Sequence, residues 1–129
     1  MKYISFVVPS YNSQEYLAKC LDSLVIGGEE VEIIIVNDGS KDRTLEIARE
    51  YEAKYPTIIK VIDKENGGHG SGINAGLKVA KGIYYKCVDS DDWVDKDAYF
   101  KLLETVLITC DGTAKTTYSA PFKASSASL

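Results

Sequence analysis

Four short apolar segments alternate with stretches of helical periodicity, and this alternation limits the folds that the chain can adopt. The apolar segments are residues 4–8, 31–36, 58–62 and 83–88. Residues 33–36 of the second segment are all apolar, without the alternation expected of a strand that has one face in water. Such unbroken runs are typical of strands covered on both faces. The order therefore predicts an α/β fold, with a mainly parallel β-sheet flanked by helices.

Helices are expected after Asn12, over residues 42–55, after Ser71 and over residues 96–108. Asn12 and Glu15 form a capping-box-like pair that predicts the start of the first helix. Ser71 is a candidate cap for the third helix, and Gly82 lies where a C-terminal cap of that helix belongs. Asp95 is expected to cap the last helix.

A polar segment follows each predicted strand. These segments are residues 9–12, 37–40, 66–72 and 89–92, and the third holds four glycines in seven residues. Ligands of parallel sheets bind outside the carboxyl ends of the strands. Because all four segments follow such ends, we expect them to meet at one ligand site.

The last polar segment has three carboxylates in four residues, from Asp89, Asp91 and Asp92. Like charges this close repel each other, and a divalent cation removes the repulsion. Mg²⁺ and Mn²⁺ favour carboxylate oxygen, and water and nucleotide phosphates complete such sites. If strand alternation continues beyond Val88, Asp89 and Asp91 share one face and Asp92 points away. The alternative is that the acidic residues only cap the following helix at its positive end.

Composition narrows the class of protein and its partners. The chain has 129 residues, 45% of them hydrophobic and 26% charged, as is ordinary for one soluble globular domain. Its net charge of -4 argues against a nucleic-acid partner. Three cysteines without CxxC spacing argue against a disulfide framework or a zinc site. No apolar run approaches the ~20 residues of a transmembrane helix, so a cytoplasmic location is expected, membrane-peripheral for a longer protein.

Four motifs together resemble those of family 2 glycosyltransferases. They are Val-Val-Pro-Ser-Tyr-Asn at 7–12, Val-Asn-Asp-Gly-Ser at 36–40, Asn-Gly-Gly at 66–68 and Asp-Ser-Asp-Asp at 89–92. The resemblance covers roughly residues 3–108 and implies a Rossmann-like GT-A fold, that of nucleotide-diphospho-sugar transferases. We expect this domain over residues 1–109, and an irregular or poorly ordered tail, with an irregular strand near 116–118 as an alternative, over residues 110–129.

The resemblance also implies an activity. Such enzymes bind a nucleotide-diphosphate sugar, most often a UDP-sugar, with Mn²⁺ or Mg²⁺ at an Asp-x-Asp (DXD) motif. They transfer the sugar with inversion to a glycan or lipid-linked acceptor. The form of the glycine-rich and acidic segments is similar to that of bacterial members that build surface polysaccharides.

The resemblance assigns substrate binding to a set of residues: Pro9, Tyr11, Asn12, Asp38, Asn66, Gly68, Ser71, Asp89, Ser90 and Asp91. Asp38 is expected to accept a hydrogen bond from the base, and a carboxylate suits the N–H of uracil. Asp91 and Asp89 are the expected metal ligands, and Asp89 is also expected to contact the ribose or the sugar. The alternatives are an Asx-type turn for Asp38, packing at the sheet edge for Tyr11 and a helix cap for Asn12. His69 and Trp93 are further candidates, with solvent and the core as their respective alternatives.

Two features depart from the family pattern. Residues 72–74 are Gly-Ile-Asn where many members have Ala-Arg-Asn, so amides of residues 70–72 or His69 are the expected replacements for the arginine. The general base that family members supply after the acidic motif has no candidate here, because none of the later acidic residues is suitable. Those residues are Asp95, Asp97, Glu104 and Asp111. We therefore expect a donor-binding part that binds nucleotide with metal but transfers sugar poorly or not at all.

Two other functions stay open. One is a non-catalytic nucleotide-binding fragment, because no general base is apparent. The other is a haloacid-type phosphatase, which also places two aspartates at the end of a strand. That class requires Asp-x-Asp-x-Thr/Val early in the chain, whereas Trp93 follows the acidic segment here.

Overall fold

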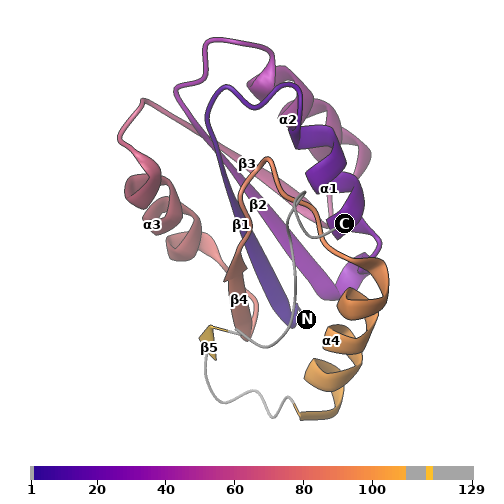
Figure 1. The fold of residues 1–129 in the computed structure, drawn as a ribbon. Coiled ribbons are helices and arrows are strands. Elements are labelled where there is room, and N and C mark those ends of the chain that lie inside the picture. Colours follow the sequence, from indigo (N-terminus) through magenta and orange to yellow (C-terminus); the bar gives the residue numbers. More distant parts are fainter. Residues whose placement is uncertain (1, 110–115, 118–129) are drawn as a thin grey trace.

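The computed structural model describes the backbone of residues 2–109 and 116–117, and the side chains of residues 2–68 and 70–105. Strands and helices alternate along the chain (Figure 1). They are β1 (Ile4–Ser10), α1 (Leu17–Val25), the 3-10 helix η1 (Gly28–Glu30), β2 (Val31–Asp38), α2 (Thr44–Lys54), β3 (Ile59–Lys64), α3 (His69–Val79), β4 (Tyr84–Cys87), α4 (Lys96–Thr109) and β5 (Thr116–Thr117). The strand order is β3-β2-β1-β4-β5, and all neighbouring strands are parallel. The predicted α/β class is confirmed.

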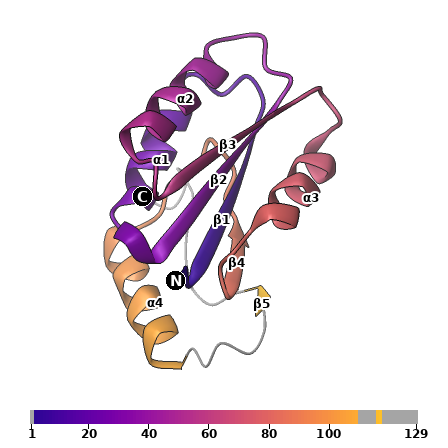
Figure 2. The ribbon, with the colours of Figure 1, turned by 180° about the vertical axis from the view of Figure 1, so that it is seen from behind.

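Helices cover both faces of the sheet. Helix α3 lies on one face, and α1, α2 and α4 lie on the other (Figures 1 and 2). Phe6 and Val8 of β1 pack in the core cluster of the three-helix face, whereas Val7 between them packs in the cluster below α3. In β2, Ile33 likewise packs in the cluster of the three-helix face and Ile34 in the cluster below α3. Because both faces are covered, β2 needs apolar residues at successive positions, as its sequence predicts.

Helix α4 is attached to the core through Tyr99, which is fully buried. The Tyr99 ring packs edge-on against Phe6 with 5.6 Å between ring centroids, and its hydroxyl donates to the Leu24 carbonyl at 2.7 Å. The predicted Asp95 cap is confirmed, since Asp95 Oδ2 accepts from the Ala98 amide at 2.9 Å. These contacts fix the segment that follows the acidic turn.

Three other predicted helix ends are wrong. Helix α1 begins at Leu17, and Asn12, at a φ of 50°, accepts instead from the Lys41 amide at 2.8 Å. Ser71 lies inside α3, which begins at His69. Gly82 follows the end of α3 at Val79, and its amide donates to Ser5 Oγ at 2.7 Å.

The predicted tail falls mostly outside the described residues. Thr116–Thr117 forms β5 beside β4, so the strand expected near residue 116 is present. Residues 110–115 and 118–129 lie outside the described part of the chain. Among the helices that are described, none is both long enough and apolar enough to cross a membrane.

A buried carboxylate connects the strands at the edge of the sheet where β1 and β2 begin. Glu32 is 2% exposed and accepts from Ser5 Oγ at 2.7 Å and from the Lys81 amide at 2.8 Å. Lys60 Nζ of β3 lies 3.2 Å from its other oxygen. Burial alone raises the pKa of Glu32, but the hydrogen bonds from Lys81, Ser5 and Lys60 hold this pKa below its ordinary value. Glu32 is therefore ionised and fully paired at neutral pH.

We expect Glu32→Gln to lower the free energy of unfolding by roughly 1–3 kcal/mol at pH 7, because it removes a charge-assisted acceptor. Since the folded pKa of Glu32 is depressed, its contribution is present above an unfolded pKa of about 4.3 and is lost as pH falls through the folded value. The difference between variant and wild type should therefore shrink in acid, which urea denaturation at pH 7 and pH 3 measures. Glu50→Gln, at an exposed position of α2, is the control; an equal effect there would contradict the expectation.

Candidate functional site

Two neighbouring hollows lie where the strands of the sheet end. They share Pro9 and Tyr11. The nucleoside hollow, as we call the first, has a volume of ≈ 250 Å³ and is also lined by Ser10, Asp38, Asn66, Gly68 and Gly72. The acidic hollow, with a volume of ≈ 410 Å³, is also lined by Asn12, Ser13, Tyr16, Asp89, Ser90 and Asp91. Of the predicted substrate-binding set, every residue except Ser71 thus lines one of the two hollows.

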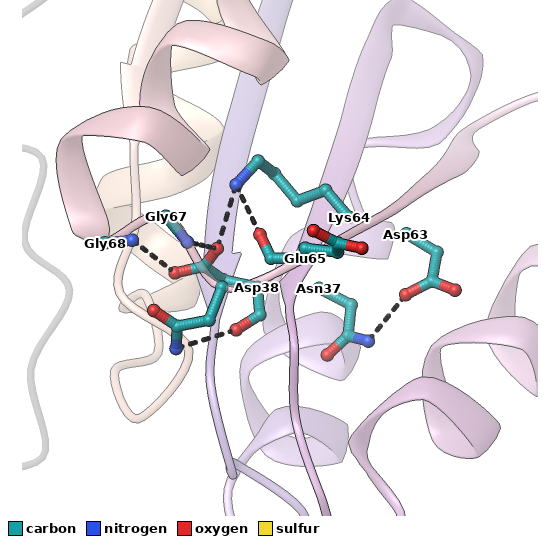
Figure 3. Close-up of polar contacts among 8 residues, drawn as sticks. Asn37, Asp38, Asp63, Lys64, Glu65, Gly67 and Gly68 are labelled. Atoms are coloured by element: carbon teal, nitrogen blue, oxygen red, sulfur yellow. Dashed lines mark hydrogen bonds and ion pairs between the residues drawn. The ribbon is translucent and has the colours of Figure 1, made fainter.

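Asp38, at the end of β2, is held by the segment that follows β3 (Figure 3). Its Oδ1 accepts from the Gly67 amide at 2.8 Å and from Lys64 Nζ at 3.0 Å, and its Oδ2 accepts from the Gly68 amide at 3.0 Å. Asp38 is 5% exposed, and burial alone raises its pKa. The hydrogen bonds from Gly67, Lys64 and Gly68 outweigh burial and lower the pKa of Asp38 below its ordinary value. Asp38 is therefore an ionised acceptor at the wall of the nucleoside hollow.

The turn after Asp38 touches the same segment. Asn66 Nδ2 donates to the Asp38 carbonyl at 3.2 Å. Gly39 has a φ of +72°, and a Cβ at this position would lie 2.7 Å from the Asn66 backbone nitrogen. A glycine is needed there for both reasons. Because the Asp38 carboxylate accepts from residues 67 and 68, the Asx-type turn considered for it is not what holds the side chain.

Hydrogen bonds join the loop after β1 to the loop after β2. The Asn12 amide donates to Ser40 Oγ at 2.9 Å, and Asn12 Oδ1 accepts from the Lys41 amide. The Ser13 amide donates to Thr44 Oγ1 at 2.7 Å. Sequence reasoning missed Ser13 and Thr44. The sequence carries no local signal for this pair, because Ser13 lies in the loop after β1 and Thr44 is the first residue of α2, 31 residues later. These contacts position the Pro9–Asn12 segment between the two hollows.

The acidic segment turns immediately after β4, which ends at Cys87. The Asp92 amide donates to the Asp89 carbonyl at 3.0 Å, and the carboxylate oxygens of Asp89, Asp91 and Asp92 lie within 4.8 Å of one another. The expectation that Asp92 points away is wrong, because the chain turns here instead of continuing as a strand with alternating side chains. Three clustered carboxylates fit a divalent cation that prefers oxygen ligands, such as Mg²⁺ or Mn²⁺.

Side chains from the loop after β1 and from α1 contact the acidic turn. The hydroxyls of Ser90 and Ser13, both buried, are 2.5 Å apart. The Cys20 thiol of α1 lies 3.7 Å from the Asp89 carbonyl. Burial raises the pKa of Cys20 to about 12, and the charges of Asp92, Asp91 and Asp89 contribute to the rise. The thiol is thus protonated and acts as a neutral support for the turn.

The remaining candidates are Trp93, the amide of Gly72 at the wall of the nucleoside hollow, and His69. Lys19 Nζ lies 3.5 Å from the centroid of the Trp93 ring, so this ring stacks with a cation and lines neither hollow. The Gly72 amide, expected to contact phosphate, donates to the Gly68 carbonyl at 3.2 Å. The side chain of His69 is outside the described set.

The later acidic residues that the structure describes lie away from the site. Asp95 caps α4, whereas Asp97 and Glu104 line a separate surface hollow on α4 together with Phe100. Asp111 lies outside the described residues. Of the acidic residues that follow Trp93 in the described part of the chain, none lines the nucleoside or acidic hollow.

A parallel sheet with an acidic turn and a glycine-rich segment at its carboxyl edge defines the class as a Rossmann-like GT-A fold. Comparison with known proteins gives the family. The model of glycosyl transferase family 2 matches residues 5–120. The chain belongs to glycosyltransferase family 2.

Relatives and solved structures agree with this assignment. The chain is 43% identical over 102 residues to the uncharacterized glycosyltransferase EpsJ of Bacillus subtilis, with 78% of this chain and 29% of EpsJ covered. It is 42% identical over 103 residues to the poly(ribitol-phosphate) beta-glucosyltransferase of Bacillus spizizenii, with 76% and 16% covered. The crystal structure of S. aureus TarS 1-349 in complex with UDP-GlcNAc matches with a TM-score of 0.72 and 35% identity, over 84% of this chain and 32% of that one. The chain thus spans 29% of the length of EpsJ and about a third or less of each of the others.

Proposed function

We propose that this chain is the donor-binding part of a glycosyltransferase that binds a UDP-sugar together with Mg²⁺ or Mn²⁺. The observation that supports this best is the adjacency of the two hollows, which share Pro9 and Tyr11. A nucleoside would occupy the hollow beside Asp38, and the diphosphate and sugar would occupy the acidic hollow. TarS, which is 34% identical, has been solved in complex with UDP, and this supports uridine as the nucleoside.

In the nucleoside hollow, the Asp38 carboxylate would accept a hydrogen bond from the N–H of uracil. Tyr11 is 49% exposed at the boundary of the hollows, where its ring can cover the base or the ribose. Asn66 and Gly68 would form the opposite wall, and Ser71 would contribute from the first turn of α3. Pro9 would complete the nucleoside site near the end of β1, and Asn12, which lines the adjacent acidic hollow, would border it.

In the acidic hollow, Asp91 and Asp89 would hold the cation, and Asp92 is near enough to be a further ligand. A cation bound there supplies Lewis-acid stabilisation of the departing diphosphate. Asp89 would also contact the ribose or the sugar, with Ser90 supporting the turn through Ser13. These side chains would orient the anomeric carbon toward the open side of the hollow.

An acceptor hydroxyl that attacks opposite the diphosphate would invert the anomeric centre, and it needs a general base within hydrogen-bond reach. We propose that no residue of this chain supplies the base, so that the chain alone transfers sugar poorly or not at all. Two relatives, the poly(ribitol-phosphate) beta-glucosyltransferase and the minor teichoic acid biosynthesis protein GgaB, support a bacterial surface polymer as the acceptor. We propose that catalysis takes place in the cytoplasm, at the membrane surface in the whole protein.

Isothermal titration calorimetry with UDP tests the proposal. We expect binding that is tighter with Mn²⁺ or Mg²⁺ than with EDTA, because the cation joins the diphosphate to the acidic turn. An inert fragment without a nucleotide site would show no binding of UDP. A haloacid-type phosphatase would hydrolyse p-nitrophenyl phosphate and show no preference for UDP; either result would exclude the proposed function.

A further inference from the structure

Lys64, the last residue of β3, is the register partner of Asp38 at the end of β2. Its Nζ donates to Asp38 Oδ1 at 3.0 Å and to the Glu65 carbonyl at 2.7 Å (Figure 3). Its side chain is 23% exposed, whereas the Asp38 side chain is 8% exposed. Lys64 is therefore a partly buried cation between a carboxylate and the backbone just before the glycine-rich segment.

These contacts use most of the acceptor capacity of Asp38. An ionised carboxylate offers about four acceptor sites, two on each oxygen. Oδ1 accepts from Lys64 and from the Gly67 amide, so both of its sites are used. Among the residues whose side chains are described, Oδ2 accepts from the Gly68 amide alone, which leaves one of its sites. Lys64 thus leaves Oδ2 as the oxygen that can accept from a ligand.

Lys64 also stabilises the position of Asp38. A carboxylate this buried needs a nearby cation or several donors, because removing its partner leaves a charge that solvent reaches poorly. The amides of Gly67 and Gly68 supply two donors only while the glycine-rich segment keeps its conformation, in which Gly68 has a φ of +90°. By bonding to both Asp38 and the Glu65 carbonyl, Lys64 ties the start of this segment to the end of β2.

We propose that Lys64 is a positioning residue for pyrimidine selection. It orients Asp38 so that the free site on Oδ2 accepts the ring N–H of uracil. Cytosine has an unprotonated nitrogen at the same ring position, and its lone pair repels a fixed carboxylate. The role of Lys64 rests on the proposed function, since it acts through the nucleoside hollow.

The chain offers a matched control on the same strand. Lys60 of β3 also pairs with a buried carboxylate of β2, Glu32, at 3.2 Å. That pair lies toward the other end of the sheet, and neither residue lines a hollow at the site. Replacing Lys60 therefore measures the general effect of losing a lysine–carboxylate pair between β2 and β3. Any additional effect of replacing Lys64 comes from the position of its pair at the nucleoside hollow.

The test is calorimetry of UDP and CDP in Mn²⁺ with wild type, Lys64→Met, Lys64→Arg and Lys60→Met, with thermal unfolding of each. We expect wild type to prefer UDP. Lys64→Met should weaken UDP binding roughly tenfold, the effect of one charge-assisted hydrogen bond, and reduce the preference over CDP. In Lys64→Arg, the affinity for UDP and the preference over CDP should both lie within about threefold of wild type. Lys60→Met should change neither the affinity nor the preference.

An unchanged UDP-to-CDP ratio in folded Lys64→Met, or the same loss in Lys60→Met, would overturn the role of Lys64. If Lys64→Met does not fold, the milder Lys64→Gln gives the same comparison, and an unchanged ratio there would also overturn it. Failure of wild type to bind UDP would instead exclude the proposed function. The two failures are thereby distinguished.

Discussion

Replacing Asp91 with alanine is expected to remove the dependence of UDP binding on Mn²⁺ while the fold persists. Asp91 is exposed at the acidic turn, and its carboxylate lies within 4.8 Å of those of Asp89 and Asp92. With one of three clustered ligands removed, affinity for the cation should fall by at least the roughly 10–100-fold that follows loss of an outer-shell partner. Since the Asp91 side chain is exposed and belongs to neither core cluster, the melting temperature should change little.

Calorimetry of UDP with and without Mn²⁺ measures this effect, and manganese titration followed by electron paramagnetic resonance measures it without nucleotide. Asp97→Ala is the matched control, because Asp97 is an exposed aspartate in the first turn of α4 outside both hollows. Asp97→Ala should retain the metal dependence of wild type. If Asp91→Ala retained it too, the acidic turn would not be the metal site.

The edge where the site lies was predictable, because the strands of a parallel sheet all run in one direction and so have their carboxyl ends at the same edge. Asp38, Asp89 and Asp91 could therefore be selected from their positions after apolar runs. Asp92 could not, since its direction depends on the turn at Asp89, where strand alternation stops. The same physical limit applies to helix ends: Asn12 is a good local cap, but a contact with Lys41 in a neighbouring loop prevails.

Lys64 shows a second limit of the sequence. As a polar residue that ends a strand it has no local signal, and its role follows from the register that pairs it with Asp38. Register depends on how two strands pack against the core, over a separation of 26 residues. Ser13 and Thr44 are hidden from the sequence for the same reason, at a separation of 31 residues. Polar contacts between segments that are far apart in the sequence are thus the part of the site that requires coordinates.

Replacing Asp38 with alanine is expected to weaken the binding of uridine and UDP by roughly 10–100-fold, with or without metal. The substitution removes the acceptor for the base, and it also leaves Lys64 Nζ and the amides of Gly67 and Gly68 without their shared partner. Hydrogen bonds to a charged group contribute about 1.5–3 kcal/mol, and each 1.4 kcal/mol is tenfold in affinity. Asp63→Ala is the control, since Asp63 is an exposed aspartate on the same edge that bonds Asn37 and lines neither hollow.

The pH dependence of uridine binding gives an independent test of Asp38, because uridine has no phosphate that titrates. Burial raises the pKa of Asp38, but the hydrogen bonds from Gly67, Lys64 and Gly68 lower it by more, so the net shift of this pKa is downward. A depressed folded pKa means that the ionised form persists above about pH 3.9 and is lost only as pH falls through the lower folded value. Uridine affinity, followed by NMR titration, should therefore stay constant from pH 7 to pH 5. A decline within that range would mean that a group other than an ionised Asp38 accepts the hydrogen bond from the base.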